Sequence, residues 1–340
     1  MADEVVDQAW LRTVLASVGG STDRTERLTG GAVNHTYRVD RADAEPVVLR
    51  FAVDPLRTDE FPVEAWAAEQ ASRIGIPTAR PIAHGVEGGV PYALSEYVAP
   101  DPRAVHRPWR WLGTYARSVA AIPLRDAPPM LYSRFGTDLA HAWSAHLAYN
   151  LDALGPHDPI RRDGAYASPE GVHDLLEPLL TGEFAFGLAH GDLAPRNLVS
   201  RGPDRPPVLI DWGAAETGPT PWTDARRVFE WTFVDGSVAR ADHDDFTAAA
   251  GLTSAADLRT LASMTALHLL DVTRWAREHR PDQYDEYVGR CRTGLDRIAR
   301  TPVERQRRRH PGRAPASPAP RTSASVTRGP TDRARRRGPR

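Results

Sequence analysis

The chain has 340 residues, 41% of them hydrophobic and 26% charged, an ordinary balance for a folded protein with room for two lobes. Its single cysteine, Cys291, excludes a disulfide framework and a cysteine-based zinc site, and indicates a reducing, cytoplasmic setting. No apolar run is long enough for a membrane helix, and the acidic N-terminus lacks the pattern of a signal peptide, so no membrane partner is expected.

The charges are unevenly distributed, and all 43 basic residues are arginine. Twelve of them lie in residues 301–340, against Glu304 and Asp332, so the tail is basic and the body acidic. The tail is rich in Pro, Arg, Ala and Ser and predicts disorder, because it has too little apolar surface to bury. No aromatic residue interleaves its arginines, so only weak nucleic-acid binding is expected of it.

The first hundred residues alternate strand-like and helical patterns. Helical periodicity covers 5–18 and 61–74. Strand-like runs cover 24–29, 34–40, 47–53 and 92–98. This order predicts a small β-rich lobe over residues 1–97.

The rest of the chain is mainly helical. Helical periodicity covers 109–122, 136–154, 170–180, 222–234 and 255–278. Two segments, His190–Asn197 and Pro207–Gly213, interrupt it with loop and short-strand character. The prediction is an α+β fold with a second, larger helical lobe over 98–300, followed by a disordered tail over 301–340.

The two interrupting segments carry the strongest chemical signal. Asp192 and Asn197 are five positions apart, and Asp211 follows the apolar run Val208–Ile210. Metal-dependent phosphoryl transfer needs a carboxylate to position the acceptor hydroxyl and oxygen ligands to hold Mg²⁺ against the phosphates of a nucleotide. We assign the first role to Asp192 and the second to Asn197 and Asp211.

A glycine turn is a candidate phosphate cradle. Gly30 and Gly31 lie between two predicted strands, where backbone N–H groups can approach phosphates without an intervening Cβ. Asn34 adds a side-chain donor. A hairpin turn without a ligand is the competing interpretation of Gly30–Gly31.

A cation is also expected near the phosphates. Arg50 lies in the predicted strand after the glycine turn, and an arginine can hold a phosphate bidentately. A carboxylate on the following helix should fix it in place; Glu64 and Glu69 are candidates, and Glu64 is preferred.

Together these residues resemble the aminoglycoside phosphotransferase and choline kinase-like family of small-molecule kinases, over about residues 24–300. The main motif is His-Gly-Asp followed by Asn197, with Asp-Trp-Gly at 211–213. The resemblance implies a two-lobed protein kinase-like fold, use of ATP or GTP with Mg²⁺, Asp192 as the catalytic residue, and Asn197 and Asp211 as metal ligands. It also makes His190 a brace for the loop rather than a base.

The resemblance interprets three further positions. Residues 94–98 look like the hinge between lobes, where the backbone of Glu96 and Val98 would bond the adenine edge. Asp224 corresponds to an Asp that starts the next helix, with a structural role. Arg50 stands where kinases have a lysine.

The acceptor is expected to be small. Asp224 follows Gly213 within eleven residues and no Ala-Pro-Glu element occurs, so there is no long activation segment to bind a peptide. The predicted function is ATP-dependent phosphorylation of a hydroxyl on a small molecule. The acidic body favours a cationic acceptor such as an aminoglycoside, and neutral hydroxylated compounds, including other antibiotics, stay open. The alternative is a nucleotide- or ligand-binding regulatory protein of kinase fold without transfer activity.

Overall fold

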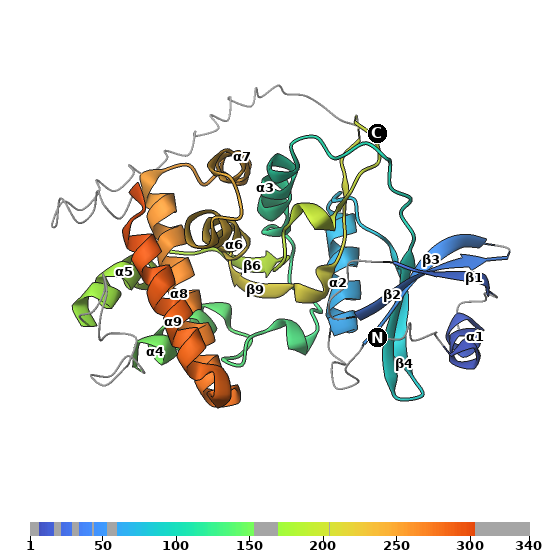
Figure 1. Ribbon diagram of the computed structural model, residues 1–340, viewed down its shortest axis with the longest axis horizontal. Coiled ribbons are helices and arrows are strands. Elements are labelled where there is room, and N and C mark those ends of the chain that lie inside the picture. The colour runs from blue at the N-terminus through green and yellow to red at the C-terminus, as the bar shows by residue number, and fades with distance from the viewer. Residues whose placement is uncertain are drawn as a thin grey trace, which may run out of the picture.

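The computed structural model describes residues 7–16, 22–28, 34–42, 44–52, 60–152, 169–203 and 205–302. Gly30, Gly31 and the tail from residue 303 lie outside these ranges. Figure 1 shows an antiparallel sheet at one end of the molecule and helices at the other. The chain therefore has the predicted α+β architecture, with the sheet in the N-terminal part.

The sheet has five strands in the order β1-β2-β3-β5-β4. All four predicted strand-like runs begin and end within about three residues of an observed strand, and β4 was not predicted. The strands are β1 (Thr22–Arg27), β2 (Asn34–Arg41), β3 (Ala44–Ala52), β4 (Pro81–Glu87) and β5 (Val90–Glu96). The antiparallel pairing places β3 at the centre, with Arg50 opposite Thr36 of β2 and Ala93 of β5.

Two helices accompany the sheet. α1 (Gln8–Ala16) buries Leu11, Val14 and Leu15 in a small core with the inward residues of the sheet. α2 (Glu60–Arg73) lies between the sheet and the helical part (Figure 1) and buries Val63 and Ala67 in the main core. α2 therefore faces β3 with one side and the helical part with another.

Seven further helices and four short strands follow. The helices are α3 (Pro108–Val119), α4 (Leu139–Asp152), α5 (Pro169–Thr181), α6 (Trp222–Glu230), α7 (Arg240–Ala250), α8 (Ala255–His279) and α9 (Tyr284–Ala299). The short strands pair as β6 (Phe186–Ala189) with β9 (Glu216–Pro219), and β7 (Leu198–Val199) with β8 (Val208–Leu209). The two segments expected to interrupt the helices lie beside these strands.

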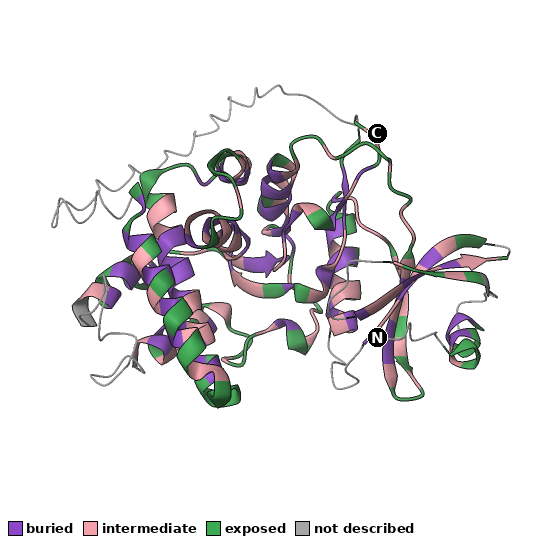
Figure 2. Ribbon diagram, in the orientation of Figure 1, coloured by how far each residue is buried: buried purple, intermediate pink, exposed green. Residues whose placement is uncertain are grey.

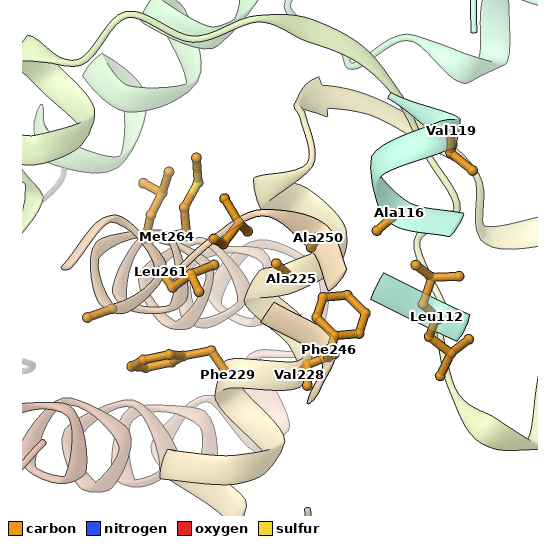
Figure 3. Close-up of a cluster of buried hydrophobic side chains, with 14 of the residues drawn as sticks. Leu112, Ala116, Val119, Ala225, Val228, Phe229, Phe246, Ala250, Leu261 and Met264 are labelled. Atoms are coloured by element: carbon orange, nitrogen blue, oxygen red, sulfur yellow. The ribbon is translucent and has the colours of Figure 1, made fainter. Parts of the chain in front are cut away.

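The main core lies among the helices, where Figure 2 shows most of the buried residues. In α3 the apolar side chains Leu112, Ala116 and Val119 follow helical spacing and face Val228 and Phe246 of α6 and α7 (Figure 3). Such spacing gathers one apolar stripe on each helix, so the helices must pack against one another to remove those stripes from water. No helix in the described ranges is long and apolar enough to cross a membrane.

Candidate active site

The candidate catalytic loop runs from His190 to Asn197, between β6 and β7. Its second residue, Gly191, lies in the left-handed region at φ 78°, and a Cβ there would lie 2.0 Å from the carbonyl oxygen of Ala214. Only glycine fits both the conformation and the contact. The loop ends in the 3₁₀ turn Pro195–Asn197, whose last residue is buried.

His190 is fully buried, and both of its ring nitrogens bond to backbone groups. Its Nδ1 accepts a hydrogen bond from the N–H of Asp192 at 3.3 Å, so its Nε2 carries the proton and donates to the carbonyl of Ile210 at 3.2 Å. Burial lowers the pKa of His190 to about 4. The ring is therefore neutral and joins the catalytic loop to the strand before Asp211.

Asp224, in the first turn of α6, holds the same loop from the other side. Its carboxylate accepts hydrogen bonds from the backbone N–H groups of His190 at 3.1 Å and Gly191 at 2.9 Å. The side chain is buried, and this burial raises the pKa of Asp224 to about 7. Its contacts are to the loop backbone, which suits the structural role expected of it.

The carboxylate of Asp192 is surrounded by donors. Its Oδ2 lies 3.0 Å from Nδ2 of Asn197, and Nη2 of Arg196 lies 2.7 and 2.6 Å from Oδ1 and Oδ2. Nη1 of Arg227 lies 3.3 Å from Oδ1. Burial opposes ionisation of Asp192, but these donors outweigh it and hold its pKa below the ordinary value.

Sequence reasoning missed both of these arginines. Arg196 lies within the recognised motif, four residues after Asp192, but the segment is a loop, so no helical spacing pairs the two residues. Arg227 comes from α6. Its guanidinium donates to the carbonyl of Gly191 at 2.9 Å and lies 5.2 Å from the ring centre of Trp231. No local pattern in the sequence pairs it with Asp192.

Arg50 lies at the centre of a second cluster. Its guanidinium is 2.5 Å from Glu64, 3.2 Å from Glu60 and 3.1 Å from Asp211. Burial alone would lower the pKa of Arg50, but the three carboxylates raise it. Glu69, the other sequence candidate, instead pairs with Arg73 on an exposed face of α2.

Asn34 joins this cluster through Glu60, which was not predicted because it precedes the helix expected from residue 61. Nδ2 of Asn34 donates to Oε1 of Glu60 at 2.8 Å. Oδ1 of Asn34 is buried and has no hydrogen-bond partner among the residues that the structure describes. Such a polar atom is costly unless a ligand or water satisfies it.

Asn197 and Asp211 fit a magnesium site by their chemistry. Nδ2 of Asn197 also donates to the Asp192 carbonyl at 2.8 Å, which leaves the amide oxygen Oδ1 for a cation. The carbonyl of Asn197 accepts from the N–H of Ile210 at 3.0 Å, so the two candidate ligands are brought together by neighbouring backbone. Asp211 has φ 66° and a side chain that is 43% exposed. An amide oxygen and a carboxylate are hard ligands of the kind Mg²⁺ prefers.

The expected hinge follows β5. The N–H of Glu96 already donates to the carbonyl of Arg80 at 2.9 Å, so only the Glu96 carbonyl remains for a nucleotide base. The N–H of Val98 has no acceptor within the described ranges. One acceptor and one donor two residues apart match the edge of adenine.

A cavity of about 190 Å³ lies between α4, α6, α8 and β9. Two carboxylates, Glu216 and Asp271, line it together with the imidazoles of His146 and His268. Glu216 is open to the cavity, yet the surrounding protein raises its pKa by desolvation. Burial lowers the pKa of both histidines, so the charged groups of the lining are the two carboxylates and Arg226, whose guanidinium pairs with Glu230.

The cavity lies beside the catalytic loop. Glu216 pairs in the β6–β9 ladder with Ala189, the residue before His190. Arg226 lines the cavity, and its neighbour Arg227 contacts Asp192. The cavity therefore adjoins the 190–197 loop, although no residue of that loop lines it.

Comparison with known proteins identifies the family of the chain. Residues 24–258 match the model of a family described as the phosphotransferase enzyme family. No curated protein matches the sequence.

Solved structures share the fold at low identity. Macrolide 2'-phosphotransferase MphH from Brachybacterium faecium is 16% identical, with a TM-score of 0.56 over 84% of this chain and 97% of that one. Choline kinase LicA from Streptococcus pneumoniae is 15% identical, with a TM-score of 0.52 over 86% and 98%. A thermostable mutant of aminoglycoside phosphotransferase APH(4)-Ia, in ternary complex with ADP and hygromycin B, is 16% identical, with a TM-score of 0.54 over 86% and 99%.

Proposed function

Since the chain belongs to the phosphotransferase enzyme family, we propose that it is an ATP-dependent kinase that phosphorylates a hydroxyl group of a small molecule. The observation that carries this proposal is the convergence of Asp192, Asn197, Asp211 and Arg50 from three separate segments. Phosphoryl transfer depends mainly on positioning and on charge stabilisation, and these four side chains supply both.

Each residue has a role in the proposed reaction. Asp192 accepts the hydrogen bond of the acceptor hydroxyl and takes its proton, while that oxygen bonds the γ-phosphorus and the bond from phosphorus to the bridging oxygen of ADP breaks with its electron pair. Asn197 and Asp211 would hold Mg²⁺, which offsets phosphate charge when bound. Arg50, fixed by Glu64 and Glu60, would contact the α- and β-phosphates.

Nucleotide binding is supported on the other side of the cleft. The Glu96 carbonyl and the Val98 N–H would bond adenine, or guanine if GTP is used. Asn34 lies beside the Arg50 cluster, and its Oδ1 has no partner among the described residues. Gly30 and Gly31, which lie outside the described ranges, stay the proposed phosphate cradle.

The cavity next to the β6–β9 ladder favours a small molecule as the acceptor. Its carboxylates, Glu216 and Asp271, favour a hydroxylated molecule that carries an amine, such as an aminoglycoside-like antibiotic. A hydroxylated antibiotic without an amine would depend instead on the aromatic wall of the cavity, which Trp143 and Phe186 form.

The test is a phosphorylation screen of aminoglycosides, other antibiotics and hydroxylated metabolites with Mg·ATP, read by the mass of the product. Asp192→Asn should lower the rate of any transfer found by about 100-fold or more, because it removes the proton acceptor but keeps the shape. Asp242→Asn, which changes a half-buried aspartate in the first turn of α7, is the matched control. Tight binding of Mg·ATP without transfer to any acceptor would favour the regulatory alternative.

A further inference from the structure

Donors surround both oxygens of Asp192. An ionised carboxylate offers about four lone-pair directions, two on each oxygen. Three of them accept hydrogen bonds: Arg196 donates to Oδ1 at 2.7 Å and to Oδ2 at 2.6 Å, and Asn197 donates to Oδ2 at 3.0 Å. Arg227 lies 3.3 Å from Oδ1 as an ion pair, so an acceptor hydroxyl competes with Arg196 at either oxygen.

Arg196 is the donor that is free to leave. Asn197 is 4% exposed and is also bonded to the Asp192 carbonyl, and Arg227 is also bonded to the Gly191 carbonyl. The side chain of Arg196 is 58% exposed, and in the described ranges its guanidinium contacts Asp192 alone. A long exposed side chain with a single partner rotates at little cost.

A further cation near the transferred phosphoryl group would add to the charge that Mg²⁺ supplies. Arg50 is shared among Glu60, Glu64 and Asp211, so its charge is already outnumbered by carboxylates. The chain has no lysine to take its place. Charge that builds on the transferred phosphoryl group is best offset by a guanidinium near its three peripheral oxygens.

We propose that Arg196 is a catalytic residue that changes partner: the acceptor hydroxyl displaces it from Asp192, and its guanidinium then contacts the phosphoryl group in transit. This inference rests on the proposed function. The proton still passes from the hydroxyl to Asp192, the new bond forms between the acceptor oxygen and the γ-phosphorus, and ADP leaves with the electron pair of the broken bond. Arg196 forms no covalent bond and supplies charge only as transfer proceeds.

The test compares Mg·ADP with Mg·ADP plus tetrafluoroaluminate, which imitates the phosphoryl group in transit, by titration calorimetry. In the wild type tetrafluoroaluminate should tighten ADP binding. Arg196→Gln should lose about 100-fold of that tightening, while the affinity for Mg·ADP alone changes by less than about threefold. Arg196→Lys should recover only part of it, because an ammonium lacks the planar fork of the guanidinium.

The matched control is Arg290→Gln, which removes another exposed arginine that pairs with a carboxylate four residues away, in α9 and outside the site. It should behave as the wild type. If Arg196→Gln keeps the full tightening, or binds the analogue more tightly, Arg196 only covers Asp192 and the inference is wrong. A wild type that binds Mg·ADP but gains nothing from tetrafluoroaluminate also overturns it, whereas a wild type that binds no nucleotide overturns the proposed function itself.

Discussion

His190 and Asp224 hold the 190–197 loop in place through hydrogen bonds with its backbone. His190 joins the loop to Ile210, and Asp224 holds the N–H groups of His190 and Gly191. Every backbone group so held would otherwise be a buried donor or acceptor without a partner. The position of Asp192 therefore depends on two side chains whose own chemistry is suppressed by burial.

The buried ring of His190 makes stability depend on pH. Its pKa is about 4 in the folded protein against an ordinary value of about 6.5, so between these values the unfolded chain binds a proton that the folded chain does not. Its contribution to stability is complete above pH 6.5 and is lost as pH falls toward 4. From pH 6.5 to 5 that loss is about 2 kcal/mol.

Comparison with His190→Asn isolates this effect, because asparagine keeps hydrogen-bonding atoms but does not titrate. Urea denaturation at pH 8, 6.5 and 5 gives the free energy of unfolding of both proteins. The advantage of the wild type should shrink by about 2 kcal/mol between pH 6.5 and 5. Asp224 titrates in both proteins and cancels from the difference. A difference that stays constant with pH would show that His190 is not buried as a neutral ring.

The sequence identified the residues of the site better than their partners. The sequence predicts Asp192 and Asn197 because both lie in one short motif, and it predicts Asp211 because that residue directly follows an apolar strand. Arg227 is 35 positions from Asp192 along the chain, and only the packing of α6 against the catalytic loop brings them together. Contacts of this kind depend on tertiary structure, so no local spacing predicts them.

At the scale of elements, the contact between α3 and α7 depends on one glycine. A Cβ on Gly113 would lie 2.2 Å from the carbonyl oxygen of Phe246, a backbone atom that cannot turn aside. Gly113→Ala should therefore destabilise the protein by about 2 kcal/mol, although alanine is the better helix former by about 1 kcal/mol. Thermal and urea denaturation measure the change.

Gly289 in α9 provides the opposite control. A Cβ there meets nothing within 4 Å, so Gly289→Ala should stabilise the protein by about 1 kcal/mol through helix propensity alone. Equal effects of the two substitutions would mean that α3 and α7 are not packed so closely.

Most elements with a clear period were predicted, but α7 and α9 were not, although the buried residues of α9 recur at helical spacing. α2 and β3 follow helical and strand-like patterns and appear within a residue or a few of their expected bounds. β4 begins at Pro81 and contains Gly85, residues that read as breaks in a strand. Its place at the edge of the sheet, where β5 is its one neighbour, accommodates both.

For the whole molecule, the Arg50 cluster joins the sheet to the helical part. Arg50 on β3, Glu64 on α2 and Asp211 after β8 meet there, so a ligand on this cluster would touch parts of the chain far apart in sequence. A ligand that binds only the folded state stabilises it in proportion to the logarithm of its concentration. Under the proposed function, nucleotide binding is therefore coupled to stability.

Mg·ATP at 100 times its dissociation constant should therefore stabilise the protein by about 2.7 kcal/mol and raise its melting temperature by about 5–10 °C. Asp211→Asn should remove the part of the shift that requires Mg²⁺, because an amide is a weaker ligand without charge. Scanning calorimetry with ATP alone, Mg²⁺ alone and both together separates the contributions. Because Asp211 also pairs with Arg50, the variant without ligand must be measured as its own baseline. An undiminished magnesium-dependent shift in Asp211→Asn would remove Asp211 from the metal site and leave its role as a partner of Arg50.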